Sequence, residues 1–248
     1  MEQRIVLVSG WGQSEHACEP LLSALKRSGA VEWVRPEGSL EDMIARLDVR
    51  LSGTGQDTRT LVVGWSLGGQ LLLHWLSRRS PPYPKGLGLC LLASNPCFVA
   101  RDGWPGVAED VFQNFRSQLG SDPRGCLMRF QAMQTQGSDQ GAADLRWLRR
   151  DPALSALNGG GEGLSRDELR TTLEWLLTLD ERKTLANWPE ALRRPLVLLG
   201  ENDVLIPPSL AHHLQPWADV RTLPKMAHYP GLATVDTLVG LVTGWWTA

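Results

Sequence analysis

The chain has 248 residues, of which 42% are apolar and 21% charged; this balance is typical of a globular protein and too apolar for a disordered one. A formal net charge of −2 argues against a generally basic nucleic-acid-binding surface, and no apolar stretch reaches the roughly 18 residues of a membrane-spanning helix. We therefore expect neither nucleic acid nor membrane among its partners.

Short apolar runs alternate with segments of helical spacing along most of the chain. The runs typical of buried strands cover residues 4–8, 31–34, 60–64, 86–93, 195–199 and 220–223. The segments typical of helices cover residues 19–27, 40–51, 67–77 and 235–245. Most of these runs are of the buried type rather than alternating, and helices separate them, which indicates an α/β fold with a mostly parallel sheet covered on both faces.

Residues 96–186 interrupt this alternation. Strand patterns disappear there, and the helical pieces cover residues 108–119, 123–135, 138–149 and 165–180. Because the segment begins and ends between two core strands, we expect an insertion over the sheet. The predicted organisation is a core of residues 1–95 and 187–248 and a helical cap of residues 96–186.

The cysteines and the N-terminus point to one compartment. The four cysteines form no C-x-x-C pair and have no histidine at metal-ligand spacing, so we expect no disulfide framework, no metal and no cofactor. The apolar run of residues 5–8 is too short for a signal peptide, and no cleavage site follows it. The prediction is a cytoplasmic monomer.

The strongest chemical signal is the pentapeptide GWSLG at residues 64–68, which has the pattern G-x-S-x-G. It follows a strand pattern and opens a helical one, the setting in which a serine is exposed on a sharp turn. Ser66 is therefore the candidate nucleophile. The alternative is a helix N-cap, but a cap does not require the flanking glycines.

A serine hydroxyl is a weak nucleophile without a neighbouring base. Asp203 follows the strand pattern of residues 195–199, and His228 precedes the last helix, so the chain order is Ser, Asp, His. In this arrangement Ser66 attacks an acyl carbon, His228 carries the proton, and Asp203 orients the imidazole. The side chains that could compete for these roles are Glu201, His16, His74, His212 and His213.

An oxyanion hole needs two backbone N–H groups near the nucleophile. Leu67, the residue after the serine, is expected to supply one, and Trp11 in the loop after the first strand the other; a simple glycine turn is the alternative for that loop. The chain holds 11 tryptophans against 4 phenylalanines, and two of the indoles, Trp11 and Trp65, flank these groups. We therefore expect Trp11 and Trp65 to line an apolar acyl channel.

Three further strings extend the pattern: SNPCFVARD at residues 94–102, WPG at 104–106 and RFQAMQT at 129–135. With the serine pentapeptide, they make the chain resemble the α/β-hydrolase superfamily over nearly its whole length and, more narrowly, the pimeloyl-acyl-carrier-protein methyl ester esterases of biotin synthesis. The resemblance implies a carboxylesterase that hydrolyses the methyl ester of pimeloyl-acyl carrier protein to methanol and the free carboxylate. It also implies Phe130 as a substrate-binding residue.

The resemblance further implies that arginines of the cap bind the acidic carrier protein. The phosphopantetheine group of this carrier holds the methyl-pimeloyl chain. Arg129 and Arg146 match family positions, and Arg124 lies near a third. Ala142 occupies a position where the family has arginine, with Arg149 and Arg150 as substitutes. The alternative is a solvated helix face paired with neighbouring aspartates.

The first loop also departs from the family, which usually has His-Gly-Trp-Gly where this chain has SGWG at residues 9–12.

Two other functions stay open at this point. One is a generic hydrolase of small-molecule esters or of carbon–carbon bonds in free metabolites, since a fold does not determine a substrate. The other is a binding protein that kept the fold without the chemistry.

Overall fold

The computed structural model describes residues 2–52, 58–157 and 163–248, and within these ranges six parallel strands form one sheet. The strand order is β2-β1-β3-β4-β5-β6, so the chain starts near one edge and crosses to the other. Each of the six predicted apolar runs forms a strand, which confirms the parallel α/β prediction. The strands are β1 (Glu2–Val8), β2 (Ala30–Val34), β3 (Thr58–Trp65), β4 (Leu87–Leu92), β5 (Leu196–Gly200) and β6 (Asp219–Leu223).

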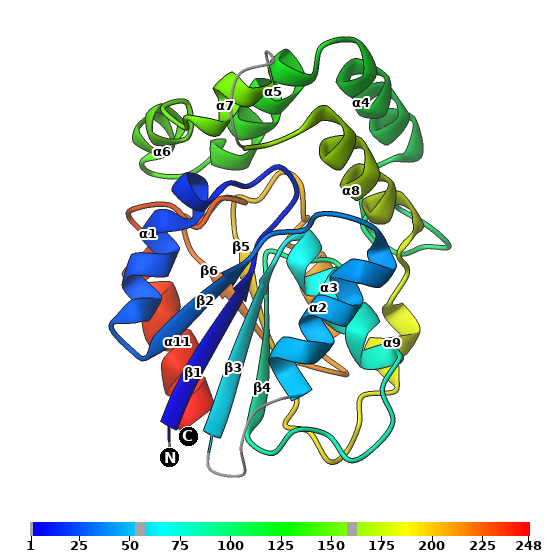
Figure 1. Cartoon of the computed structure of the whole chain (residues 1–248), viewed down its shortest axis with the longest axis vertical. Helices are drawn as coiled ribbons and strands as arrows, with labels where there is room; N and C mark the ends of the chain where they lie inside the picture. The colour runs from blue at the N-terminus through cyan, green and yellow to red at the C-terminus, as the bar shows by residue number, and fades with distance from the viewer. Residues whose placement is uncertain (1, 53–57, 158–162) are drawn as a thin grey trace.

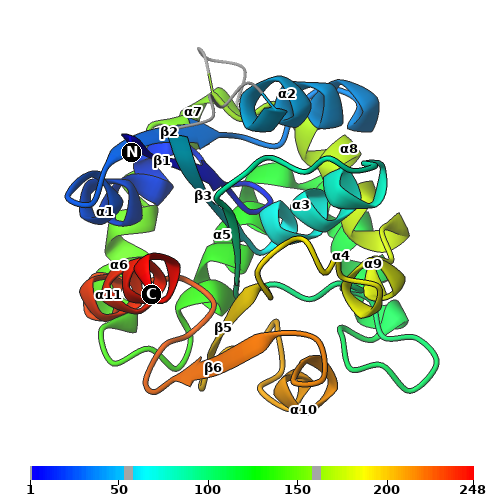
Figure 2. The same ribbon diagram turned by 90° about the horizontal axis from the view of Figure 1, so that it is seen from below.

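Helices cover both faces of this sheet (Figure 2). One face carries α1 (Glu15–Lys26) and α11 (Val235–Thr247), and the other carries α2 (Leu40–Ser52), α3 (Leu67–Ser77) and α9 (Arg182–Ala186). The short helix α10 (Leu210–Leu214) lies beside β6. Because side chains alternate along a strand, Ile5 and Leu7 pack on the α1 side, whereas Val6 and Val8 pack on the α3 side.

The boundary of α1 shows what local capping adds to periodicity. The helix begins at Glu15, earlier than the predicted start at residue 19. The hydroxyl of Ser14 accepts a hydrogen bond from the N–H of Ala17 at 3.2 Å and so satisfies one of the free donors of the first turn. Periodicity missed this turn because its apolar positions start later.

Five helices of the inserted segment lie above the carboxyl ends of the strands (Figure 1), and we call them the cap helices. They are α4 (Glu109–Ser121), α5 (Pro123–Thr135), α6 (Gly141–Leu148), α7 (Ala153–Ala156) and α8 (Arg166–Thr178). The segment's two ends meet at an antiparallel bridge between Cys97 and Asp180, and α9 then packs against α3. The cap helices are therefore joined to the sheet at one paired stem.

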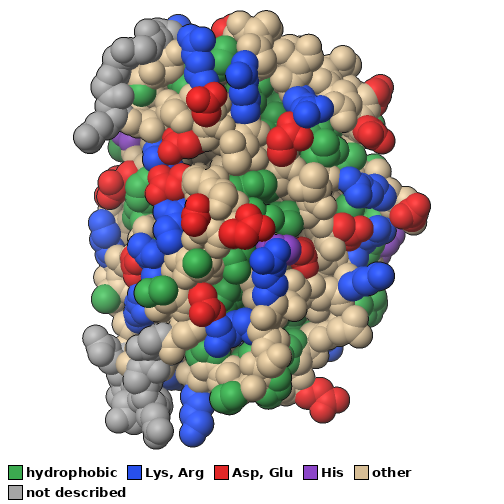
Figure 3. Space-filling view, turned by 45° about the vertical axis from the view of Figure 1, so that its right-hand side comes forward, with side chains coloured by type: hydrophobic (Ala, Val, Ile, Leu, Met, Phe, Trp, Pro, Cys, Tyr) green, Lys and Arg blue, Asp and Glu red, His purple; other side chains and the backbone are tan. Residues whose placement is uncertain are grey.

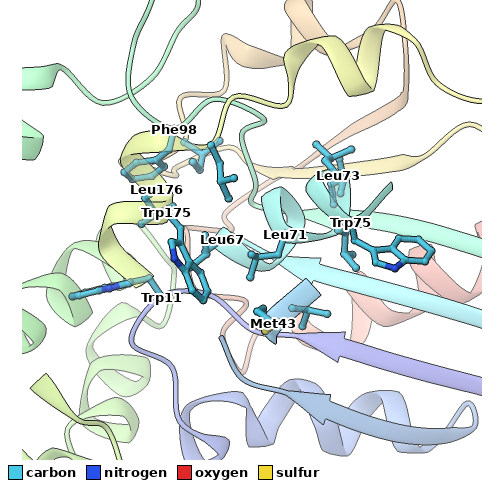
Figure 4. Close-up of a cluster of buried hydrophobic side chains, with 14 of the residues drawn as sticks. Trp11, Met43, Leu67, Leu71, Leu73, Trp75, Phe98, Trp175 and Leu176 are labelled. Atoms are coloured by element: carbon cyan, nitrogen blue, oxygen red, sulfur yellow. The ribbon is translucent and has the colours of Figure 1, made fainter. Parts of the chain in front are cut away.

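The cap helices and the sheet share one hydrophobic core. Figure 4 shows Trp175 and Leu176 of α8 in the same buried cluster as Leu67 and Leu71 of α3. The four side chains are at most 5% exposed. Burying large apolar side chains of this kind contributes about 1.5–3 kcal/mol each, so the cap side of α3 is held by packing as well as by the stem.

Within the described ranges no helix has both the length and the apolar character needed to cross a lipid bilayer. The four cysteines are all buried and unpaired.

Candidate active site

The turn between β3 and α3 holds Ser66 in a conformation that few residues adopt. Its φ is 56° and its ψ is −118°, a strained combination for a residue with a side chain. A Cβ on Gly64 would lie 2.6 Å from the Cα of Gly69, and a Cβ on Gly68 would lie 2.1 Å from the carbonyl oxygen of Val8. The two glycines thus let β1, β3 and α3 approach closely enough to force the turn.

Ser66, His228 and Asp203 form a continuous hydrogen-bonded chain. The hydroxyl of Ser66 lies 3.0 Å from Nε2 of His228, and Nδ1 of His228 lies 2.9 Å from Oδ2 of Asp203. The other carboxylate oxygen of Asp203 accepts the N–H groups of Leu205 and Ile206, each at 2.8 Å. An acceptor at Nδ1 assigns the proton to that nitrogen, which leaves the lone pair of Nε2 facing the serine hydroxyl.

This chain is shielded from water: His228 is fully buried, and Ser66 and Asp203 are only 6% and 4% exposed. The three residues come from loops that follow β3, β5 and β6, and the carboxyl ends of parallel strands meet at one edge of the sheet. The low local dielectric strengthens both hydrogen bonds of the imidazole. The arrangement can therefore activate a serine hydroxyl for attack on an acyl carbon.

The five alternative side chains lie elsewhere. They are Glu201 at the exposed turn after β5, His16 on α1, His74 on α3, and His212 and His213 on α10. In the described part of the chain, none of them is hydrogen-bonded to Ser66 or His228. His74 instead pairs with Glu181, at 2.6 Å, where the stem of the inserted segment meets α3.

Both backbone segments expected to supply the oxyanion hole border the serine. Leu67 is the first residue of α3, so its N–H has no acceptor within the helix. A Cβ built on Gly10 would lie 3.1 Å from the Cβ of Ser66, which places the loop of residues 9–12 directly beside the nucleophile. Trp11 belongs to this loop.

Trp11 and Phe130 line an apolar cavity of about 450 Å³ between the sheet and the cap helices. The indole N–H of Trp11 donates to the carbonyl of Leu169 on α8 at 2.8 Å, and its ring meets Phe130 edge-on with centroids 5.0 Å apart. The ring of Phe130 in turn lies 6.5 Å from that of His228. Phe130 therefore borders both the cavity and the ring of His228.

The remaining walls of the cavity come from residues 98–108, from α4, α5 and α8, and from the loop after β5. Of its described lining side chains only Gln136 is polar. Sequence reasoning did not single out Phe112 and Phe115 of α4, which line it. Their spacing of three residues signals one face of a helix, but not what that face covers.

The structure does not bring Trp65 to this cavity, and the expectation that it faces the pocket is corrected. Trp65 is fully buried on the α1 side of the sheet, beside Tyr229, because it has the same parity in β3 as Leu61 and Val63. Its indole N–H donates to the carbonyl oxygen of His228 at 3.2 Å. Trp65 therefore contacts the histidine loop from below.

Of the arginines named from the sequence, Arg124, Arg129 and Arg146 lie on the surface of the cap helices, and Arg149 and Arg150 are exposed in the turn after α6. Arg124 and Arg146 are exposed and make no ion pair among the described residues, while a guanidinium nitrogen of Arg129 is 3.8 Å from a carboxylate oxygen of Asp122. Figure 3 shows that basic and acidic side chains are interspersed over the coloured part of one face of the molecule. None of these arginines is among the described residues that line the cavity.

Comparison with known proteins gives a consistent family. A model described as "Alpha/beta hydrolase family" matches residues 5–240. Proteins named "Pimeloyl-[acyl-carrier protein] methyl ester esterase" from Pectobacterium carotovorum and Serratia marcescens are each 31% identical to this chain. The alignments cover 94% of this chain and 89% of the first relative, and 97% and 92% for the second.

Solved structures show the same fold at lower identity. An esterase from Exiguobacterium antarcticum superposes with a TM-score of 0.76 at 17% identity, over 99% of this chain and 92% of that one. A bromoperoxidase from Bacillus anthracis superposes with a TM-score of 0.72 at 17% identity, over 98% and 92%. Their different titles agree with a fold that carries several chemistries.

We expect Gly68→Ala to lower the free energy of unfolding by about 2 kcal/mol or more, because its Cβ would overlap the backbone of Val8. Gly240→Ala in α11 is the matched control. Nothing lies within 4 Å of a Cβ there, so we expect it to raise stability by about 0.5–1 kcal/mol. Urea unfolding of both variants measures the difference, and a Gly68→Ala protein as stable as the wild type would contradict the close approach described above.

Proposed function

We propose a specific reaction for this chain, which belongs to the alpha/beta hydrolase family and, within it, to the family of the pimeloyl-[acyl-carrier protein] methyl ester esterases. The reaction is hydrolysis of the methyl ester of pimeloyl-acyl carrier protein, a step of biotin synthesis, to methanol and the free carboxylate. The observation that carries the proposal is the buried hydrogen-bonded chain from Ser66 through His228 to Asp203 beside an apolar cavity.

In the first half of the proposed reaction, Oγ of Ser66 attacks the ester carbonyl carbon while Nε2 of His228 takes the hydroxyl proton. The negative charge moves to the carbonyl oxygen, where the N–H groups of Leu67 and Trp11 stabilise it. The intermediate collapses when the carbon–oxygen bond to the methoxy group breaks. His228 returns its proton to this group, and methanol leaves an acyl-serine.

Water repeats the sequence in the second half. His228 removes a proton from the water as its oxygen attacks the acyl carbon, and the proton then passes to Oγ of Ser66 as the carboxylic acid leaves. Asp203 accepts the hydrogen bond from Nδ1–H of His228 throughout and stabilises the imidazolium that forms in each half. The hydrogen bonds that Oδ1 of Asp203 accepts from the N–H groups of Leu205 and Ile206 hold this carboxylate in place.

The cavity supports an acyl substrate with a long polymethylene chain. The rings of Trp11, Phe115 and Phe130 meet at centroid distances of 5.0–5.9 Å and form one aromatic wall. Each methylene buried against such a wall contributes about 0.8 kcal/mol. The product has a charged carboxylate in place of the methyl ester. This charge fits the apolar wall less well, which favours release of the product.

The proposed partner is an acyl carrier protein, and the exposed cap arginines Arg124, Arg129 and Arg146 are its proposed contacts. An acidic partner helix is attracted to such guanidinium groups before it docks. We treat residues 96–186 as the cap that receives the carrier, and the single chain as the active unit, because it contributes every site residue. Four buried, unpaired cysteines favour the cytoplasm.

A second candidate function is that of a generic esterase for small free esters, and two features of the cap favour it. Ala142, where the family has an arginine, is exposed on α6, and Arg129 already lies near Asp122. Both reduce the positive charge available to a carrier. The same serine chemistry serves either substrate, so only a comparison of carrier-linked and free esters separates them.

Ser66→Ala is expected to lower kcat for a short p-nitrophenyl ester by about 10⁴-fold or more, because the nucleophile is gone while the fold stays intact. Circular dichroism and thermal melting check the fold, and a fluorophosphonate probe should label Ser66 in the wild type. Turnover by the variant at the wild-type rate contradicts the mechanism. Folded wild-type protein that takes up no probe would instead indicate a binding protein.

Charge reversal at Arg129 and Arg146 together is expected to raise KM for methyl-pimeloyl carrier protein by about five- to tenfold at low salt, with kcat nearly unchanged. KM for the free methyl ester should not move. Arg221→Glu, at an exposed position of β6 outside the cap helices, is the control. Activity on the free ester with none on the carrier-linked one would favour the generic esterase.

A further inference from the structure

The loop that carries the proposed base is attached to the cap helices as well as to the sheet. Residues 229–234 follow His228 and lead into α11. The N–H of Tyr229 donates to the carbonyl of Gln134 near the end of α5 at 2.9 Å, and the Tyr229 hydroxyl donates to Ala17 on α1 at 2.9 Å. Together with the indole of Trp65, which donates to the His228 carbonyl oxygen, these bonds fix the peptide unit that joins His228 to Tyr229.

The attachment from α6 uses a buried carboxylate. Asp144 is fully buried, although it lies on a helix at the top of the molecule. Its Oδ1 accepts the N–H of Leu232 at 3.1 Å, and its Oδ2 accepts the hydroxyl of Ser138 at 3.1 Å. The carboxylate therefore joins the cap to the loop four residues after the histidine.

The backbone of Gly231 lies in direct contact with the side chain of Asp144. A Cβ at this position would lie 2.1 Å from Oδ2 of Asp144, so the loop backbone rests directly against the carboxylate. Its N–H donates to the carbonyl of Tyr229 at 2.8 Å, which makes residues 229–231 a tight turn. A displacement at Gly231 is thus passed to Tyr229, the neighbour of His228.

Keeping Asp144 buried is costly, which argues that it has a task beyond filling space. No lysine or arginine pairs with it in the described ranges. Burial raises the pKa of its carboxyl above the usual value, and the Leu232 N–H and Ser138 hydroxyl oppose that rise. An apolar side chain would avoid this cost but could not accept the Leu232 N–H.

We propose that Asp144 is a positioning residue for the general base: through Leu232 and Gly231 it holds the His228 loop so that Nε2 faces the hydroxyl of Ser66. This inference rests on the proposed function, because it assigns His228 as the base. Asp144 touches no reacting atom; it acts on the geometry of the imidazole. Small displacements of a catalytic group lower rates steeply, since proton transfer needs near-ideal distances.

The test is Asp144→Ala, which removes both accepted hydrogen bonds. We expect kcat for p-nitrophenyl acetate, expressed per serine titrated with a fluorophosphonate, to fall about tenfold with KM nearly unchanged. Asp144→Asn should restore kcat to within about threefold of the wild type. Its amide oxygen can accept from Leu232, and its amide nitrogen can donate to Ser138.

Asp151 supplies a matched control within the same inserted segment. It is also a buried aspartate that accepts one hydroxyl, from Ser14, and one backbone N–H, from Ala153 at 2.8 Å. Its N–H partner opens α7 and is not part of the His228 loop. We expect Asp151→Ala to lose stability much as Asp144→Ala does, with no change of kcat per titrated serine.

Gly231→Ala, which keeps the carboxylate, covers the case in which Asp144→Ala does not fold. Gly231→Ala should lower kcat per titrated serine as well, since its methyl group collides with the carboxylate. In the Asp144→Asn background the side chain at position 144 keeps its size, so the collision with Gly231→Ala persists. Where the Asp144→Ala/Gly231→Ala double variant folds, the shorter side chain at position 144 relieves the collision. The two changes should therefore combine to less than the product of their separate effects.

The proposal is overturned if folded Asp144→Ala keeps the wild-type kcat per titrated serine, or if Gly231→Ala keeps it where Asp144→Ala does not fold. It is also overturned if Asp151→Ala loses as much kcat as Asp144→Ala. Failure of the proposed function has a different signature. In that case the wild type itself neither hydrolyses the ester nor takes up the probe, and no comparison between variants is needed.

Discussion

The strained turn at Ser66 is the constraint on which the site depends. Its left-handed φ of 56° persists because β1 and α3 meet at Gly68, where only a hydrogen atom fits beside the Val8 carbonyl. This contact places the serine hydroxyl above the strand ends and opens a helix with a free N–H at Leu67. The same approach brings the loop of residues 9–12 against the serine. One packing contact thus sets the nucleophile and both sides of the expected oxyanion hole.

The imidazole of His228 depends on a second set of contacts, which come from opposite sides. Trp65 reaches its backbone from the sheet, and Asp203 holds its ring from the loop after β5. From the cap, Gln134 and Asp144 bind the residues that follow it. The cap helices are therefore more than a cover for the substrate. Two of them, α5 and α6, also carry the exposed arginines proposed to meet the carrier, so a partner docked there rests on the helices that hold the base.

The apolar cavity follows from the same arrangement. Its walls come from elements that are distant in the chain, and Trp11 connects them through its bond to Leu169 on α8. Because the cap helices and α3 share one buried cluster, the cavity is enclosed by packed side chains. Water is excluded from the reacting groups, which strengthens the hydrogen bonds they make. The apolar lining of this cavity is the feature on which the proposed acyl substrate rests.

Local patterns in the sequence were enough for the six strands, for the helices of eight or more residues and for the three residues of the hydrogen-bonded chain. Short, largely apolar runs marked the four central strands and weaker ones marked β2 and β6, and glycines around Ser66 marked the turn, because both signals depend on neighbouring residues. A capping signal at Ser14 was also present and would have corrected the start of α1. The order of Ser66, Asp203 and His228 along the chain indicated partners that the structure brings within hydrogen-bond distance.

Tertiary structure alone decided which way side chains point and what they meet. The sequence placed Trp65 next to the serine, but its parity in β3 turns it to the far face of the sheet. Asp144 carries no local signal, because its partner Leu232 is 88 residues away along the chain. Such contacts depend on how the cap helices lie over the strand ends. The sequence by itself therefore determined the strands, the longer helices and the three residues of the hydrogen-bonded chain, and the packing of distant segments determined the cavity and the support of the His228 loop.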